Sequence, residues 1–541
     1  MKNIFKTFIF LFTTIFLTNC SRVKPIGSEF TSLIFSNSKK VKNINNKFFK
    51  GNETPEGMVL VEGGTFMMGQ VKDNPMFDWN TSPKKIQVGS FYMDETEVTN
   101  LEYLSYVKYI KNVFPPSEEK YKYIYSSVLP DTLAWGTTLS NTGVLSDKYF
   151  RHPAYSNYPV VGVSWLQANE YCKWRTNILN LKTLIDKGYI ENIFEIDTIS
   201  NFFDTDVFLS NDSLLFNGNK SIYKKGVPYN LRKRRDEKIV NRKSFKGRKI
   251  TQSDGILFEK FRLPTEAEWE FAAKGNINKK NIKSRTKYPW NKKSNKLKNN
   301  NQLANFKQGK VNTSFSSDGA SITNKVKSYS PNNFGLYDMD GNVSEWVADV
   351  YRPIIDTDAN DFYYYRGNLF NKKMIDSEGN LVYSAIGDNT KLKYDTLPNG
   401  KIVPKHLPGT IKLIPITKND AIYRANYSLY NNTSINDGDF KSSIHFDKNM
   451  DRNGAKNLMY NSPKPPKPVF DSVNKKIRLI IDDKKRTTLI NDKSRVYKGG
   501  SWVDRIYWLD PAQRRYLPEY MSKKFIGFRC VLDKLGPMSN K

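Results

Sequence analysis

The feature that most constrains the fold is a helix-start pattern that occurs three times along the chain. Each time, a Ser or Thr stands three residues before a Glu or Gln, which is the spacing of a capping box. The three pairs are Thr99 with Glu102, Ser164 with Gln167, and Thr265 with Glu268. Apolar residues follow each pair at helical spacing, and Gly275 is placed to end the third helix. The pattern predicts short helices packed on irregular strands, which is an α+β arrangement.

The charge balance of the chain is strongly basic. Among 541 residues, 85 Lys and Arg face 54 Asp and Glu, which leaves a formal net charge of +31. Such an excess often indicates a nucleic-acid or anionic-membrane partner. Asn and Ile are abundant together with Lys, however, as is typical of AT-rich genomes, and no P-loop, zinc-finger spacing or aromatic RNA-binding box accompanies the charge. We therefore predict no nucleic-acid partner.

Residues 1–20 have the pattern of a bacterial lipoprotein signal. Their apolar run from Phe8 to Leu17 is too short to span a bilayer and fits the core of a secretory signal. The run ends at Leu-Thr-Asn-Cys, which resembles a lipobox and predicts lipidation of Cys20; an ordinary cleaved signal is the alternative. No Asp follows the cysteine, so we expect an anchor on the periplasmic face of the outer membrane. Residues 21–55 are polar and indicate a flexible tether.

Two polar stretches interrupt a domain that otherwise extends over residues 56–535. The first, at about 181–258, carries the basic run NLRKRRDEKIVNRKSFKGRK, and the second, at about 352–490, carries NSPKPPKPVF. We interpret both as long insertions into a single core domain. A solvated face explains the basic run, and contact with an anionic surface or an acidic partner is the alternative.

Eight sequence blocks resemble, in this order, the formylglycine-generating enzyme family, also called the sulfatase-modifying factor family. They are MVLVEGGTFMMG, DETEVTNLEY, YPVVGVSW, FRLPTEAEWEFAAKG, YPW, FGLYDMDGNVSEW, KGGSW and GFRC, and they fall within 56–351 and 495–532. The resemblance implies a compact single domain with little regular secondary structure, related to C-type lectins.

The resemblance also implies a copper site that this chain has lost. In the enzymes of the family, two cysteines after the GGS-aromatic motif bind copper as thiolates, and soft thiolates suit Cu(I). Aligned on GGSW, the two positions hold Asp504 and Leu509. An aspartate is a hard oxygen ligand and a leucine has no donor, so we predict no copper, no formylglycine synthesis and no catalytic residues. The nearby cluster of Asp504, Asp510, Arg514 and Arg515 indicates a surface salt-bridge patch, with acid–base chemistry as the alternative.

Calcium is the cofactor that the resemblance still implies for this chain. The turn from Asp338 to Glu345 brings carboxylates and backbone carbonyls around a glycine, and calcium takes about six to eight hard oxygen ligands. The resemblance implies one site from the side chains of Asp338 and Glu345 and the carbonyls of Gly341 and Val343. It implies a second from the side chains of Asn305 and Asp318 and the carbonyls of Phe306 and Ala320. A hydrogen-bonded turn without metal is the alternative.

The three cysteines and three histidines nearly exclude a metal site of the Cys/His type. Cys172 and Cys530 match positions that form a disulfide in the animal enzyme, so the resemblance implies a bridge here, and the periplasm is oxidising. Two buried reduced thiols are the alternative.

Three blocks and the long insertions carry a narrower resemblance, which bears on the partners of the chain. MDETEVTN, LPDTLAWG and RHPAYSNYPVVGVSW resemble the gliding-motility lipoproteins of the J type from Bacteroidetes, which belong to the gliding and type IX secretion machinery. This implies a non-catalytic scaffold with lipoprotein K and the periplasmic ring protein N as neighbours. The alternatives are an enzyme of different chemistry in the same cleft, and a glycan- or peptide-binding module on this fold.

Overall fold

A computed structural model of the chain describes residues 54–69, 83–136, 143–195, 202–227, 247–275, 303–307, 320–351, 371–384, 392–415, 467–471, 476–480 and 493–535. The signal and tether predicted for 1–55 lie outside the described residues except for 54 and 55, and so do the lipidation site Cys20 and the calcium ligand Asp318. Within the described ranges, none of the helices combines the length and the hydrophobicity that a membrane span needs.

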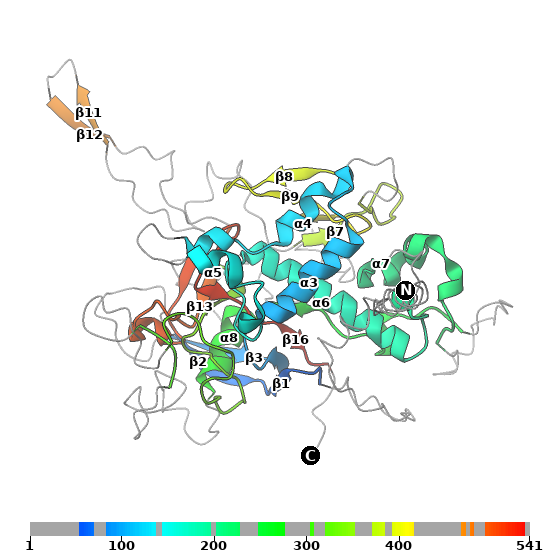
Figure 1. The fold of residues 1–541 in the computed structure, drawn as a ribbon, viewed down its shortest axis with the longest axis horizontal. Helices are drawn as coiled ribbons and strands as arrows, with labels where there is room; N and C mark the ends of the chain where they lie inside the picture. Colours follow the sequence, from blue (N-terminus) through cyan, green and yellow to red (C-terminus); the bar gives the residue numbers. More distant parts are fainter. Residues whose placement is uncertain are drawn as a thin grey trace, which may run out of the picture.

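Two four-stranded sheets bring the two ends of the described chain together (Figure 1). The first has the order β1 (Met58–Val61), β4 (Phe91–Asp94), β16 (Val531–Asp533) and β5 (Phe261–Arg262), with antiparallel pairs throughout. The second has the order β14 (Arg515–Pro518), β13 (Ser494–Lys498), β6 (Ser344–Val350) and β15 (Ile526–Gly527), in which β15 is parallel to β6. A hairpin of β2 (Gly64–Met68) and β3 (Lys84–Val88) lies beside them. The segment around GFRC therefore contributes to both sheets.

The three predicted capping boxes are confirmed at the starts of α3 (Asn100–Val113), α6 (Trp165–Asp186) and α8 (Glu266–Lys274). The third helix ends at Gly275, which adopts φ +54, as predicted from its glycine. The expectation of short helices is wrong for α6, which has 22 residues and continues past residue 181 into the first predicted insertion. Its last turns are retained because Leu181 and Leu184 are buried in the hydrophobic cluster of that insertion.

Smaller elements connect these parts of the described chain. They are the helices α4 (Lys122–Val128), α5 (Gly143–Lys148) and α7 (Thr205–Asn211), the 3-10 turns η3 (Thr132–Trp135) and η14 (Ile506–Leu509), and the paired strands β7 (Asn371–Lys373) with β10 (Leu413–Pro415), β8 (Tyr394–Thr396) with β9 (Ile402–Pro404), and β11 (Lys467–Asp471) with β12 (Lys476–Ile480). The mixed helices and strands agree with the predicted α+β arrangement.

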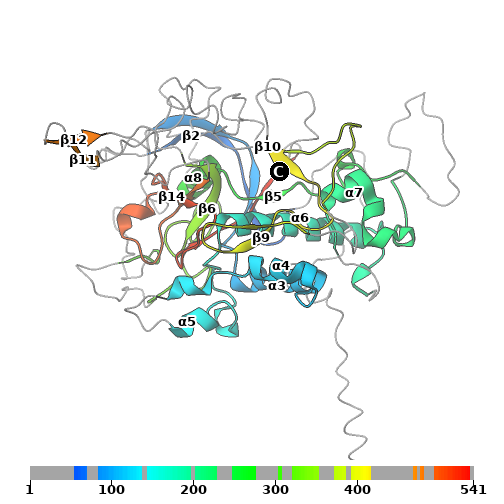
Figure 2. The same ribbon diagram turned by 90° about the horizontal axis from the view of Figure 1, so that it is seen from above.

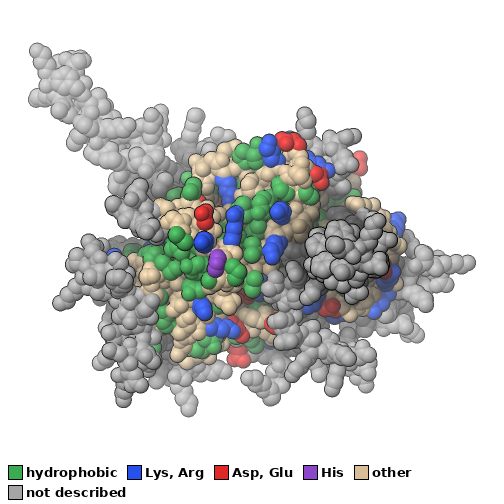
Figure 3. Space-filling model, viewed as in Figure 1, with side chains coloured by type: hydrophobic (Ala, Val, Ile, Leu, Met, Phe, Trp, Pro, Cys, Tyr) green, Lys and Arg blue, Asp and Glu red, His purple; other side chains and the backbone are tan. Residues whose placement is uncertain are grey.

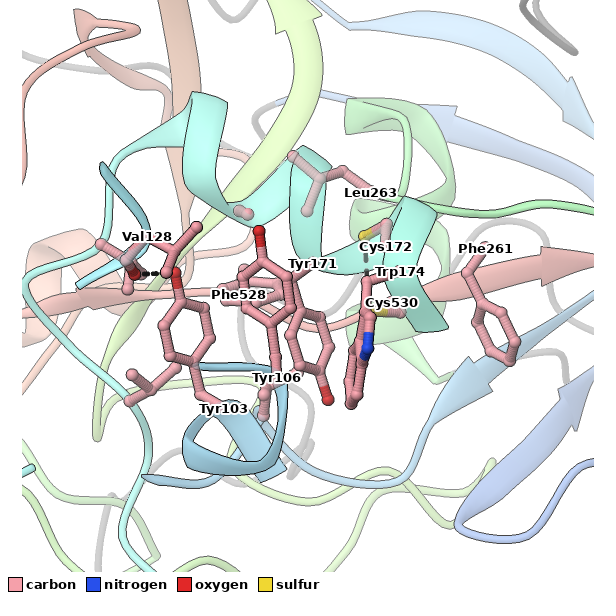
Figure 4. Close-up of a cluster of buried hydrophobic side chains, with 14 of the residues drawn as sticks. Tyr103, Tyr106, Val128, Tyr171, Cys172, Trp174, Phe261, Leu263, Phe528 and Cys530 are labelled. Atoms are coloured by element: carbon pink, nitrogen blue, oxygen red, sulfur yellow. Dashed lines mark hydrogen bonds between the residues drawn. The ribbon is translucent and has the colours of Figure 1, made fainter. Parts of the chain in front are cut away.

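The core is rich in aromatic rings that α3 and α6 supply from facing sides (Figures 1, 2 and 4). Tyr103 of α3 stacks on Tyr171 of α6 with ring centroids 5.6 Å apart, and Phe528 of the GFRC segment packs edge-on against Tyr171 at 5.3 Å. The Tyr103 hydroxyl donates a hydrogen bond of 2.9 Å to the carbonyl of Val128. Buried tyrosines need such a partner, so the helix pair is fixed by ring packing and by polar satisfaction together.

The two long insertions pack against each other, which the sequence did not predict. Ile411 of the second insertion is buried in the same cluster as Phe203 and Phe208 of the first. Asp206 of α7 pairs with Lys373 of β7 at 3.1 Å. In addition, β9 lies against α4 (Figure 1), where Lys401 donates to the carbonyl of Leu129 at 2.8 Å. The described residues of the first insertion and of 371–415 in the second thus form one lobe on the helical side of the core, whereas β11 and β12 lie apart from it (Figure 1).

Candidate functional site

The candidate site is the turn after β13, where the KGGSW motif meets α8. Lys498 ends β13 and is 1% exposed, and its Nζ lies 3.2 Å from Glu266 Oε1 and 2.9 Å from Glu270 Oε2. The two glutamates are four residues apart on α8, so they present both carboxylates on one helical face. Glu270 also accepts from Lys274 Nζ at 2.6 Å and from the amide of Gly69 at 2.7 Å. The acidic residues of LPTEAEWE therefore neutralise a buried lysine, and this buried network fixes the turn.

The glycines of the motif are required by close packing. Gly499 has φ +95, and a β-carbon there would lie 2.9 Å from the ring of Trp269. Gly500 has φ +67, and a β-carbon there would lie 2.9 Å from the carbonyl oxygen of Trp508. Gly499 accepts a hydrogen bond of 2.8 Å from the amide of Gly341, which joins this turn to the DMDGN turn. A larger residue at either glycine would separate the two turns.

Position 504 is occupied by a neutralised carboxylate. The two oxygens of Asp504 accept bidentate hydrogen bonds of 2.6 and 2.8 Å from Arg515, and Ser501 donates a further one to Asp504. The Arg515 guanidinium also lies 4.8 Å from the ring centroid of Tyr497 and 4.7 Å from that of Trp508. A bidentate pair held between two rings is strong and specific in geometry. The hydrogen bonds of the Asp504 carboxylate therefore stabilise the turn.

Position 509 is part of the core. Leu509 at the end of η14 is 0% exposed and packs with Ala304 and Phe306 in a small hydrophobic cluster. One family position for a copper thiolate therefore holds an ion pair and the other holds an apolar side chain. Residues of these types do not fit Cu(I), which needs soft donors.

The expectation of a surface salt-bridge patch at Asp504, Asp510, Arg514 and Arg515 is wrong in two respects. Asp510 and Arg514 are only 3% and 4% exposed, so they lie in the interior. Arg514 pairs with Glu266 at 2.7 Å instead of joining the Asp504–Arg515 pair. The physical reason is that Arg514 and Arg515 are neighbours at the start of β14, and neighbouring side chains of an extended chain point to opposite sides.

At the first predicted calcium site, the two carboxylates differ in their partners. Glu345 accepts hydrogen bonds from Arg529 at 2.7 and 2.8 Å and from the indole of Trp269 at 2.8 Å. Asp338 accepts the amide of Lys327 at 2.9 Å and is hydrogen-bonded to the side chain of Glu97. Asp338 and Gly341 have positive φ, so the turn is tight, as predicted. Asp338 is therefore more available to a cation than Glu345, which is largely committed to Arg529.

A third carboxyl group, Glu97, belongs to this region and was missed from the sequence. Glu97 is 0% exposed and lies close enough to Asp338, Glu345 and Arg529 for electrostatic coupling. Its Oε1 accepts from the Asn342 amide at 3.0 Å, and its side chain is hydrogen-bonded to that of Asp338. Burial, with a contribution from Asp338, raises the pKa of Glu97 well above its usual value, and burial raises the pKa of Asp338 to about 6. One sequence signal could have identified Glu97, because this acid directly precedes the buried Val98 in DETEVTN.

The buried acids of this region can be compared with what a divalent cation requires. Glu97, Asp338 and Glu345 would carry three negative charges beside the guanidinium of Arg529 if all were ionised, and the raised pKa values of Glu97 and Asp338 reflect the cost of that state without a further cation. Within the described ranges, no three His, Cys, Asp or Glu side chains converge as a metal site does, so backbone carbonyls would have to complete the coordination. The carbonyls that the resemblance implies, of Gly341 and Val343, belong to the same turn. The residues present therefore fit a hard cation, and calcium would neutralise the excess charge.

The second predicted site lies next to the first. Asn305 is 0% exposed, its amide nitrogen donates to the carbonyl of Ile322 at 2.9 Å, and its Oδ1 has no donor. The amide of Asn342 donates to the carbonyl of Asn305 at 2.8 Å, which places Asn305 and Phe306 against the DMDGN turn. Asp318 lies outside the described residues, and Ala320 is the first described residue after it. An orphaned oxygen on a buried amide fits a ligand position for a hard cation.

The predicted disulfide is not formed in the structure. Cys172 of α6 and Cys530 of the GFRC segment are both buried, and their sulfur atoms lie 3.4 Å apart as thiols (Figure 4). A disulfide requires a sulfur–sulfur distance of about 2.05 Å. The two positions lie next to each other in the core, as a bridge between them would require, and the disulfide itself stays a prediction.

Comparison with known proteins finds similarity to formylglycine-generating enzymes and to inactive C-alpha-formylglycine-generating enzyme 2. The model of the sulfatase-modifying factor enzyme 1-like domain matches residues 45–386. The chain is 40% identical over 93 residues to inactive C-alpha-formylglycine-generating enzyme 2 from Mus musculus, which is 17% of this chain and 27% of that protein. It is 34% identical over 119 residues to the formylglycine-generating enzyme of Mus musculus, covering 21% and 30%. It is 23% identical over 313 residues to that of Streptomyces coelicolor, covering 55% and 70%. The matches to the two mouse proteins thus span less than a third of either.

Proposed function

The chain belongs to the family of the sulfatase-modifying factor enzyme 1-like domain, and from this premise we propose that it is a non-catalytic scaffold of the bacterial cell envelope. The observation that carries the proposal is the filling of both copper positions, by the Asp504–Arg515 pair and by the buried Leu509. The family fold survives without its reactive thiols because KGGSW and LPTEAEWE are tied by the buried Lys498 network. Similarity to both an active and an inactive mouse relative is consistent with a lost activity.

We further propose the location and the machine in which the scaffold acts. The lipobox-like end of residues 1–20 supports lipidation at Cys20 and an outer-membrane anchor facing the periplasm. The resemblance of MDETEVTN, LPDTLAWG and RHPAYSNYPVVGVSW to gliding-motility lipoprotein J supports a role in gliding and type IX secretion. The proposed neighbours are lipoprotein K and the periplasmic ring protein N. Calcium is the proposed structural cofactor, and copper is not.

Two surfaces support the proposal as docking places for such neighbours. One is the lobe of the two insertions, in which Asp206 pairs with Lys373. The other is an apolar spot at η3 and α5, where Leu133 is 80% and Val144 is 60% exposed. On the face in Figure 3, hydrophobic side chains gather among Lys and Arg side chains over the region of α3 to α5. Exposed apolar residues on contacting elements are typical of interaction sites.

The test of the catalytic half of the proposal uses the purified chain and its reversion. The wild-type chain should bind no stoichiometric Cu(I) and should leave a cysteine-containing sulfatase peptide unconverted, as judged by peptide mass. The double variant Asp504→Cys, Leu509→Cys restores two thiols at the family positions and serves as the matched positive control for metal capture. Turnover by the wild-type chain on any thiol-bearing peptide would refute the proposal.

The test of the scaffold half is made in cells. Photo-crosslinking residues at Leu133 and at Ile375 of the insertion lobe should capture lipoprotein K or ring protein N, whereas the same residue at the exposed Leu535 is the control. Depletion of the chain should reduce cargo export and the abundance of lipoprotein K. Capture of glycans or unrelated peptides instead would favour the binding-module alternative, and full export after depletion would exclude the secretion role.

A further inference from the structure

A cavity of about 20 Å³ lies in the first insertion, beside α7 (Figure 1). Two antiparallel backbone bridges fix its walls, one between Ile190 and Tyr223 and one between Val227 and Arg248. Val227 and Arg248 exchange amide-to-carbonyl hydrogen bonds of 2.9 and 3.0 Å. A water-sized sphere needs about 10–15 Å³, so the cavity has room for the head of one side chain.

The walls of the cavity are largely aromatic. Tyr189, Phe208 and Tyr223 contribute their rings to the lining, and the rings of Phe208 and Tyr223 stack with centroids 6.4 Å apart. The hydroxyl of Tyr223 donates to the carbonyl of Asp212 at 2.8 Å. Because that hydroxyl already has its partner, the ring offers carbon surface to whatever enters the cavity.

Three cations also line the cavity, and two of them are neutralised by acids of this chain. Asp254 accepts hydrogen bonds from Arg248 through both of its oxygens, and Asp212 accepts from Lys249 Nζ at 2.5 Å. Lys225 is the third. It is exposed, its Nζ lies 5.0 Å from the centroid of a wall ring, and no acid of the described residues pairs with it. The cavity therefore presents one uncompensated positive charge.

The charge of the neighbouring sequence has the same sign. Between the bridge residues Val227 and Arg248 the sequence carries eight Lys and Arg against two acids. This run is not part of the site. Since both of its ends are fixed beside the cavity, its charge adds to the positive potential there. An anionic ligand is therefore favoured over a neutral one.

The available groups select a carboxylate among the anions. A phosphate is bound best by the free fork of an arginine, but the fork of Arg248 is occupied by Asp254. A lysine ammonium is a point charge, and one carboxylate matches the single charge of Lys225. The methylene groups of a Glu or Asp side chain would lie against the aromatic walls, where their burial is favourable.

We propose that this cavity binds a carboxylate side chain from an acidic segment of a partner protein. Lys225 donates to the carboxylate oxygens, and the rings of Tyr189 and Tyr223 enclose the aliphatic part of the side chain. That the partner is a subunit held by a scaffold rests on the proposed function, whereas the binding of a carboxylate does not.

The test measures binding of a fluorescein-labelled oligoglutamate peptide to the full-length chain by fluorescence anisotropy. Lys225→Met removes the cation of the cavity. Lys220→Met is the matched control, because it removes an exposed lysine of the same insertion that does not line the cavity. Both variants lose one charge, so non-specific attraction changes equally. We expect Lys225→Met to weaken binding about tenfold and Lys220→Met about twofold or less, and Lys225→Arg should bind nearly as wild type does.

Equal affinities of Lys225→Met and Lys220→Met would overturn the proposal and assign the binding to the basic run alone. Thermal unfolding should be the same for both variants, since Lys225 is exposed and has no ion pair to lose among the described residues.

Two competitors distinguish a carboxylate from other anions. At equal ionic strength, N-acetylglutamate should displace the peptide better than inorganic phosphate does, and the advantage should disappear in Lys225→Met. Stronger displacement by phosphate, or by vesicles of phosphatidylglycerol, would overturn the proposal in favour of a phosphate ligand or a membrane surface. A wild-type chain that does not bind the peptide would also overturn it, while the scaffold role would still be decided by the export assay.

Discussion

One buried carboxylate contributes the ion pairs between the two insertions, and its removal should loosen the lobe. Asp206 lies on α7 in the first insertion, 2.7 Å from Lys260 and 3.1 Å from Lys373 of the second. Burial raises the pKa of Asp206, but the two lysines outweigh it and hold this pKa at about 2, below the usual 3.8. One pKa unit corresponds to about 1.4 kcal/mol, so the ion pairs stabilise the fold by about 2 kcal/mol at neutral pH.

The sign of the pH dependence follows from the lowered pKa. A carboxyl group with a depressed folded-state pKa stabilises the fold fully above its unfolded pKa, and the effect is lost as the pH falls toward about 2. The substitution Asp206→Asn should therefore cost about 2 kcal/mol at pH 7 and about half of that at pH 3. Lys373→Met should reproduce part of the loss, and the double variant should be less than additive because the two residues share one interaction.

The assay is amide hydrogen exchange read by mass spectrometry, because it reports the lobe separately from the core. In Asp206→Asn, peptides from α7 and β7 should exchange about thirtyfold faster at pH 7, which corresponds to about 2 kcal/mol, while peptides from α3 should not change. Asp395→Asn is the control, because its pair with Lys405 is half exposed and such pairs contribute at most about 1 kcal/mol. Equal exchange in wild type and Asp206→Asn at pH 7 would refute the reasoning, as would a loss that does not diminish at lower pH.

Three further predictions concern the candidate site. Lys498→Met should lower the free energy of unfolding by about 3–5 kcal/mol, because it leaves Glu266 and Glu270 buried without their cation; chemical denaturation measures this, and a loss under 1 kcal/mol would contradict it. Arg515→Ala should cost about 2–3 kcal/mol and should cost less in an Asp504→Asn background, since the two form one bidentate pair. Treatment with EGTA should lower the melting temperature if calcium neutralises the buried acids, and an unchanged melting curve would speak against bound calcium.

The local signals of the sequence were sufficient for the helix starts and for the turn of the candidate site. Capping boxes join residues three apart, so Thr99, Ser164 and Thr265 could be identified from spacing alone, and all three begin helices in the structure. Likewise, the tight turn at Gly341 was expected from its glycine and has φ +92. The loss of thiols at 504 and 509 also needs no coordinates, since it is a matter of residue type once GGSW is aligned.

What surrounds those residues was decided by contacts between distant parts of the chain. Glu266 and Lys498 are separated by 232 residues, and Glu97 and Asn342 by 245, so no local pattern connects them. The same holds for the shared cluster of the two insertions, in which Ile411 joins Phe208.

Contacts between distant parts of the chain also decided the length of α6 and the interior position of Arg514. Helix propensity does not distinguish a helix that stops at residue 180 from one that continues to Asp186, but burial of Leu181 and Leu184 does. The sequence by itself therefore determined which chemical groups the candidate site can contain. It supplies acids and glycines, and it places no thiol at positions 504 and 509 after GGSW. Tertiary packing alone decided which of those groups are neutralised and which, like Asp340, remain unpaired in the interior, because pairing depends on distances in space and not on spacing along the chain.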